Sequence, residues 1–162
     1  MGKSKSCTSE ELEAQYDRYG TMLFRMCMVI LCNKQDAEDV VQDTFAKYLQ
    51  TRPDFHSAEH EKAWFLRVAE NRCRDKRRAV FFRRTVSLDE IEEYAQTPEE
   101  TEILDKISTL PPRCKSVLYL HYVEGYKVRE IAEILHIREN AVKTALCRGR
   151  QILKSKLKEE LA

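Results

Sequence analysis

The last third of the chain repeats apolar residues at the spacing of amphipathic helices. A short helix is predicted over residues 127–135, with an apolar face made of Val128, Ile131, Ala132 and Leu135. The next three residues, 136–138, have the length of a tight turn between two helices. A second helix follows, and the i, i+3, i+4 rule gives its inner face: Val142, Ala145, Leu146, Gly149, Ile152, Leu153 and Leu157. This pattern predicts a helix-turn-helix.

The outer face of the second helix is polar and basic, with Asn140, Lys143, Thr144, Cys147, Arg148, Arg150, Gln151, Lys154 and Lys158. No acidic residue occurs between Asn140 and Lys158, whereas a helix that only faces water usually mixes charges of both signs. A recognition helix that lies in the major groove of DNA needs such a basic face. The C-terminal part of the chain is therefore predicted to bind DNA.

Three more helical periods occupy the first half of the chain. The first begins at an N-cap serine, Ser9, and has an inner stripe of Leu12, Tyr16, Tyr19, Leu23 and Met26 or Cys27. Asp36 is expected to cap the second helix, which buries Val40, Val41, Thr44, Phe45, Tyr48 and Leu49. Pro53 and small polar residues predict a loop over 51–57. The third helix starts near Glu59 and buries Ala63, Trp64, either Phe65 or Leu66, Val68 and Ala69.

The composition fits an all-α protein of one or two small domains. Of the 162 residues, 43% are apolar and 34% are charged, with only four glycines and four prolines. No run of 18 apolar residues is present, so we expect no insertion into a membrane. The apolar stretch 22–32 is too short for a span and lacks the cleavage site of a signal peptide, so we expect a cytoplasmic protein.

The formal net charge of +1 conceals a segregation of charges along the chain. Residues 62–84 contain nine Lys or Arg and two acids, a net charge of +7. Residues 140–158 contain six basic residues and no acid, a net charge of +6. Between them, residues 85–105 contain eight acids and no base. Two basic blocks on either side of an acidic one suggest two DNA-facing domains with a solvated connector.

Neither the cysteines nor the histidines have the spacing of a metal or catalytic cluster. The six cysteines include no CxxC pair, and most are expected to be small buried residues. The four histidines are His56, His60, His121 and His136, and they form no catalytic pattern. Without a nucleophile-base pair or a glycine-rich phosphate loop, the sequence predicts no enzyme, no metal site and no cofactor.

Several motifs resemble those of bacterial RNA polymerase sigma factors. Residues 36–45, DAEDVVQDTF, resemble the DAEDxxQxxF motif of sigma region 2, and residues 62–75, KAWFLRVAENRCRD, resemble its continuation. Several stretches of the C-terminal part resemble sigma region 4. They are Leu110-Pro111-Pro112-Arg113, residues 122–126, Glu130-Ile131-Ala132, Val142-Lys143, Arg148 and Arg150. The order, spacing and length are similar to those of the extracytoplasmic-function (ECF) group of the sigma-70 family, and the match runs from about residue 10 to 158.

The resemblance implies a role for each motif. Core polymerase would be contacted by polar residues of the DAED helix: Asp36, Glu38, Asp39, Gln42 and Asp43. The melted −10 element would be held by Trp64, Arg67, Asn71, Arg74, Arg77 and Arg78, with Asn71 beside a flipped-out base and residues 52–60 completing its pocket. The −35 duplex would be read by Lys143, Thr144, Cys147 and Arg148, with Asn140, Arg150 and Lys154 nearer the DNA backbone.

The resemblance also predicts the domain boundaries: region 2 over 9–84, an acidic linker over 85–101 and region 4 over 102–160. The composition of the linker favours a flexible, hydrated tether. Alternatively, the linker lies against a basic face and mimics DNA until polymerase or promoter displaces it.

The sequence departs from the family pattern at two positions. His136 stands in the turn where glycine is frequent, and Cys147 replaces a residue that is often larger or polar. The expected partners are bacterial core polymerase, promoter DNA and an anti-sigma factor. The main alternative is a stand-alone regulator that uses only the helix-turn-helix, and another is a sigma-like protein that binds polymerase without opening promoters.

Overall fold

The computed structural model describes residues 9–79, 93 and 95–161. Its first three helices are α1 (Ser9–Leu31), α2 (Lys34–Thr51) and α3 (Ala58–Ala79). The remaining elements are α5 (Pro98–Ser108), α6 (Pro112–Leu118), the π-helix η1 (Tyr119–Val123), α7 (Val128–Leu135) and α8 (Glu139–Leu161). The protein is all-α, as predicted, and no strand occurs among the described residues. None of the described helices is long and apolar enough to cross a membrane.

Helices α1, α2 and α3 pack on one another as a bundle. The second half of α1 is buried on all sides, with Leu23, Met26, Cys27, Val29 and Ile30 at 2% exposure or less. A helix that is apolar around its whole circumference must be covered on more than one face. Here α2 and α3 cover one side of α1, and α5 and α6 contact it as well.

The helix-turn-helix has the predicted bounds. Ile131, Ala132 and Leu135 of α7 are buried against Val142, Ala145 and Leu146 of α8, as the helical period indicated. His136 ends α7 in the left-handed region, at φ 53°, and its backbone N–H bonds to the carbonyl of Ala132. The turn therefore forms with histidine in a conformation that glycine adopts without strain.

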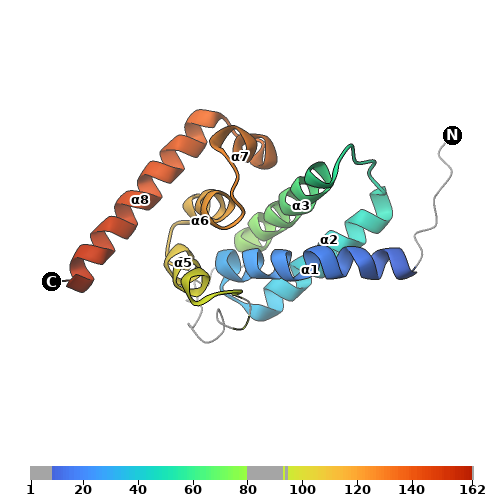
Figure 1. The fold of residues 1–162 in the computed structure, drawn as a ribbon, viewed down its shortest axis with the longest axis horizontal. Helices are drawn as coiled ribbons and strands as arrows, with labels where there is room; N and C mark the ends of the chain where they lie inside the picture. The colour runs from blue at the N-terminus through green and yellow to red at the C-terminus, as the bar shows by residue number, and fades with distance from the viewer. Residues whose placement is uncertain (1–8, 80–92, 94, 162) are drawn as a thin grey trace.

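The two halves of the molecule share one hydrophobic core. In Figure 1, α1–α3 lie on one side, α7 and α8 lie on the other, and α5 and α6 lie between them. Contacts join α3 to α7 and join α1 to both α5 and α6. Buried residues from both halves belong to a single cluster. The protein is thus closed, with its two predicted DNA-binding parts packed together.

Three local predictions are wrong. Asn33, not Asp36, caps α2: its side-chain oxygen accepts the backbone N–H of Asp36 at 2.9 Å. Tyr16 is 54% exposed because its ring packs along its own helix over Gly20. Leu157 is 41% exposed because the last turns of α8 project beyond α6.

The acidic connector is only partly described. α5 begins at Pro98, whose N-cap Thr97 accepts the backbone N–H of Glu100, so its first turn lies within the predicted linker 85–101. The rest of that linker falls largely outside the described residues, and both interpretations of it remain predictions.

Candidate nucleic-acid interfaces

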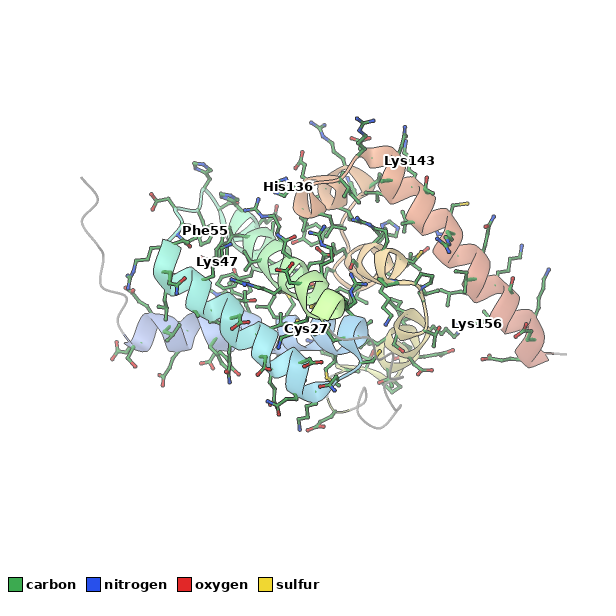
Figure 2. The ribbon with its side chains drawn as sticks, turned by 180° about the vertical axis from the view of Figure 1, so that it is seen from behind. Cys27, Lys47, Phe55, His136, Lys143 and Lys156 are labelled. Carbon is green, nitrogen blue, oxygen red and sulfur yellow. The ribbon has the colours of Figure 1, made fainter. Side chains whose placement is uncertain are left out.

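The outer face of α8 is an open row of polar and basic side chains. The seven residues predicted to contact DNA are all exposed: Asn140, Lys143, Thr144, Cys147, Arg148, Arg150 and Lys154. Among the described residues, Lys143, Arg148 and Lys154 form no ion pair. Figure 2 labels Lys143 near the start of α8 and Lys156 towards its end. Because these cations are not neutralised within the protein, the face carries a positive field available to an anion.

Close packing beneath α8 holds this row in place. A Cβ atom at Gly149 would lie 2.7 Å from Cδ1 of Leu118, which is fully buried in α6. Only glycine lets α8 approach α6 at this distance. Next to this crossing, the Nε–H of Arg150 donates to the hydroxyl oxygen of Tyr122 at 2.6 Å.

The second basic helix, α3, begins with an aromatic cluster. Trp64 is half-buried, and its ring contacts those of Phe55 at 5.9 Å, Tyr48 at 6.1 Å and Phe65 at 5.1 Å between centroids. Phe55 belongs to the loop before α3 and is labelled in Figure 2. Phe65 is fully buried, whereas Trp64 and Phe55 keep part of their surface exposed. An aromatic ring with one free face can stack an unpaired base.

The C-terminal half partly covers this surface. Nη1 of Arg67 lies 2.8 Å from Nε2 of His136, in the turn of the helix-turn-helix. Because arginine only donates hydrogen bonds, Nε2 of His136 is the acceptor in this contact. A cleft of about 360 Å³ lies beside the contact, with Trp64 and Arg67 on one wall and Glu130 and Glu133 on the other. The two carboxylates repel phosphate, so this wall of the cleft disfavours DNA in the closed arrangement.

Further along α3, Arg74 is held by two partners on its own helix, Glu70 and Asn71. Glu70 is only 3% exposed, accepts a hydrogen bond from the Ser116 hydroxyl at 3.3 Å and pairs with Arg74 at 3.5 Å. Arg74 also donates to the side-chain carbonyl of Asn71. Arg77 is half-buried, and burial lowers its pKa, with Glu70 acting in the opposite direction. The side chain of Arg78 lies outside the described set.

The acidic side of α2 faces away from its buried residues. Gln42 and Asp43 are exposed, and Asp36, Glu38 and Asp39 are half-buried at its edges. A groove of about 360 Å³ runs beside them, lined by Glu38, Val41 and Gln42 of α2 and by Tyr16, Gly20, Thr21, Phe24 and Lys34. Beneath it, Phe45 is buried between the rings of Tyr16 and Phe65, at 5.2 and 5.3 Å.

Comparison with known proteins identifies the family of the chain. Residues 15–80 match the family model "Sigma-70 region 2", and residues 100–153 match "Sigma-70, region 4". The chain is 31% identical to the ECF RNA polymerase sigma factor SigL of Mycobacterium tuberculosis, over 91% of this chain and 89% of that one. It is 27% identical to the RNA polymerase sigma factor SigV of Bacillus subtilis, over 98% of both. The chain belongs to the ECF sigma factors.

Solved structures show the same fold. The complex of CnrH with the cytosolic domain of CnrY aligns with a TM-score of 0.70 and 24% identity, over 97% of this chain and 94% of that one. The sigma factor RpoE of Bartonella quintana, solved with the anti-sigma factor NepR, aligns with a TM-score of 0.69 and 18% identity, over 92% and 98%. As an ECF sigma factor, the protein acts with RNA polymerase in transcription initiation.

The sequence did not predict the strongest contact between the two halves of this sigma factor. Arg25 of α1 is 6% exposed. Its Nε donates to the hydroxyl of Tyr119 at 3.2 Å, and its Nη atoms pair with Glu124 at 3.2 Å and Glu100 at 3.5 Å. Glu124 also pairs with Lys62 of α3 at 2.9 Å. These five residues, the Arg25 cluster, join α1 and α3 to α5 and η1.

The charges of the Arg25 cluster support one another. Burial alone would lower the pKa of Arg25, but Tyr119, Glu100 and Glu124 outweigh it, so the pKa is raised and the guanidinium stays charged. Burial raises the pKa of the Tyr119 hydroxyl well above its usual range. The signal in the sequence was the position of Arg25, the only charge in the apolar stretch 22–32. A charge buried there requires a partner from elsewhere in the chain.

Proposed function

We propose that this sigma factor uses three surfaces: α8 for the −35 duplex, α3 with the loop before it for the melted −10 strand, and the acidic side of α2 for core polymerase. The observation that carries the proposal is the row of exposed, unneutralised cations on α8. Lys143, Thr144, Cys147 and Arg148 would contact bases, and Asn140, Arg150 and Lys154 would contact phosphates.

The −10 surface would become available only after the two halves separate. Trp64 offers a stacking ring, and Arg67, Asn71, Arg74, Arg77 and Arg78 would hold the strand. Three observations support the need for separation: Arg67 contacts His136, Ser116 contacts Glu70, and the adjoining cleft has an acidic wall. Region 4 would move away from α3 when the protein joins polymerase and spans both promoter elements.

Core polymerase would dock on Asp36, Glu38, Asp39, Gln42 and Asp43 of α2. The groove between α1 and α2 supports a partner that is partly apolar as well as polar, since Glu38 lines it together with Tyr16 and Val41. The sequence motif did not indicate the contribution of α1 to this groove. Asp39 pairs with Lys76 of α3 at 3.3 Å, which links the polymerase surface to the −10 helix.

The wider role follows from membership of the family. The protein would carry out no chemistry of its own and would act in the cytoplasm, with polymerase as the catalyst. An anti-sigma factor is proposed as its regulator, because the RpoE structure of similar fold was solved with one. The boundaries proposed for its parts are 9–84, 85–101 and 102–160.

The test is run-off transcription with purified bacterial core polymerase on a genomic promoter library. The wild-type chain should give new discrete start sites. Lys143→Ala and Asp43→Asn should each reduce them, while Glu10→Gln, an exposed charge in the first turn of α1 and outside the three surfaces, serves as the control. Binding of the −35 duplex by the chain alone should fall only for Lys143→Ala. If Asp43→Asn leaves transcription and polymerase binding unchanged, α2 is not the docking surface.

A further inference from the structure

Tyr122 is a large aromatic residue that the structure leaves exposed beside α8. It is 47% exposed, lies in η1 outside the two helices of the helix-turn-helix, and was predicted only as part of a motif. Its ring is held from two sides. His121 packs edge-on at 4.8 Å between centroids, and the guanidinium carbon of Arg150 lies 5.6 Å from the ring centre.

The π-helix accounts for this position. In η1 the backbone N–H of Glu124 bonds to the carbonyl of Tyr119, five residues earlier, at 3.3 Å. Tyr119 is fully buried in the Arg25 cluster, whereas Tyr122 faces outward to Arg150. Single π-turns within helical segments frequently occur at functional sites. This one holds a buried contact on one side and exposes a phenol on the other.

The hydrogen bond between Tyr122 and Arg150 leaves unused donors on both side chains. The Nε–H of Arg150 donates to the Tyr122 oxygen, so the phenolic proton takes no part in this bond. Among the described residues, that proton has no acceptor, and the Nη groups of Arg150 have no ion-pair partner. The adjacent positive charge makes the phenol a stronger donor. The pair therefore presents O–H and N–H donors with a net positive charge, which suits two oxygens of one phosphate.

The position of Arg150 on α8 indicates that the phosphate belongs to the backbone of the −35 duplex. Arg150 belongs to the series Lys143, Cys147, Arg150 and Lys154, whose successive members are four, three and four residues apart. These side chains therefore share one edge of the helix. That edge adjoins the residues proposed to read bases. We propose that Tyr122 and Arg150 together bind one backbone phosphate of the −35 duplex, with the Tyr122 O–H donating directly to it. This inference rests on the −35 role proposed for α8 and extends its contact surface to η1.

The test measures binding of the full-length chain to a duplex that carries the −35 element of a promoter mapped by run-off transcription. Tyr122→Phe keeps the ring and removes one donor, so binding should weaken about fivefold, the usual effect of one hydrogen bond. The dependence of binding on salt should stay unchanged, because no charge is lost. Arg150→Ala should weaken binding further and reduce the salt slope by about one ion. Tyr16→Phe, which removes an exposed phenol far from α8, is the control.

A duplex with one neutral methylphosphonate in place of a phosphate locates the contact. At one position in the duplex, the methylphosphonate should weaken binding of the wild-type protein. With that modified duplex, Tyr122→Phe should cause no further loss of binding. The Tyr122→Phe effect should persist in the Arg150→Ala background. The proposal is overturned if Tyr122→Phe binds like wild type, or if its effect disappears with Arg150. Lys143→Ala tests the −35 role of α8 separately, because this variant must weaken binding if α8 contacts the duplex. If Lys143→Ala weakens binding and Tyr122→Phe does not, only the proposal for Tyr122 fails.

Discussion

The two basic helices of this sigma factor differ in how their charges are used. On α3, Arg67, Arg74 and Lys76 are in contact with His136, Glu70 and Asp39, respectively. On α8, Lys143, Arg148 and Lys154 are exposed and form no ion pair within the described chain. The two helices come from sequence blocks of similar net charge. In the folded protein, however, the cations of α8 are free to bind an anion, whereas several cations of α3 are already in contact with other residues.

The difference indicates an order of events at a promoter. With the roles proposed above, α8 would meet duplex DNA in the closed protein, whereas α3 would first have to lose its contacts with region 4. The single-strand surface would then become available only after the two halves separate. Three of the contacts between α3 and the C-terminal half are polar, those of Arg67 with His136, Glu70 with Ser116 and Lys62 with Glu124. Polar contacts of this kind can exchange for water when the two halves separate.

The largest effect is expected from Arg25→Met, which removes the cation at the centre of the Arg25 cluster. Glu124 and Glu100 would lose their buried partner, at a cost to the closed form of about 3–5 kcal/mol. The two halves should separate, with a larger radius of gyration in small-angle X-ray scattering. A single-stranded −10 oligonucleotide should also bind more tightly, because α3 is uncovered.

Arg18→Ala is the matched control for Arg25→Met. Arg18 lies on the same helix and also pairs with a glutamate, Glu61 at 3.2 Å, but both residues belong to the N-terminal bundle. This variant should leave the radius of gyration unchanged. If Arg25→Met also keeps the wild-type radius and the weak single-strand binding, the cluster does not hold the protein closed.

Gly149→Ala tests the support of the open helix. The added methyl group would lie 2.7 Å from Leu118, so strain of about 1–3 kcal/mol should outweigh the better helix propensity of alanine. Thermal unfolding should occur at a lower temperature. Gly20→Ala is the control, since its nearest neighbour is the exposed ring of Tyr16, which can move. Equal melting temperatures for Gly149→Ala and wild type would contradict the close approach of α6 and α8.

Local periodicity predicted most of the helices and much of the core. Val40, Val41, Thr44 and Phe45 of α2 are buried as expected. Most of the inner residues predicted for the helix-turn-helix are buried too, namely Ile131, Ala132, Leu135, Val142, Ala145 and Leu146. These elements depend on apolar spacing within one segment, which a single sequence contains. The same reasoning was wrong for Tyr16, whose ring packs along its own helix over Gly20. It was also wrong for Leu157, because a helical stripe does not reveal where the neighbouring helix ends.

The closed arrangement could not be predicted in this way. Arg25 meets Glu100, Tyr119 and Glu124, which lie at least 75 residues further along the chain. The spacing of residues within one segment does not indicate which distant segment that segment will contact. The motif that indicated the −10 residues therefore identified the residue types on α3 but not their contacts with region 4.

Arg148→Ala sharpens the comparison between the two helices. Binding of the −35 duplex by the free chain should weaken by about 1–3 kcal/mol if the guanidinium contacts a base edge at two atoms. An equal loss on every DNA sequence would mean that Arg148 holds only a phosphate. Arg74→Ala should leave this binding unchanged, because Arg74 lies on the covered helix. A comparable loss for Arg74→Ala would remove the distinction between α3 and α8.

The smallest effect is expected from His136→Gly, at the point where the open and covered helices meet. Glycine should relieve the left-handed backbone at φ 53° and raise the stability by up to about 1 kcal/mol. Arg52→Gly relieves a similar conformation at φ 40°, away from region 4, and measures the effect of strain alone. Because His136→Gly also frees Arg67, binding of a single-stranded −10 oligonucleotide should rise by less than about fivefold, as for one surface contact. A gain in stability without a gain in binding would mean that His136 closes the turn but does not restrain Arg67.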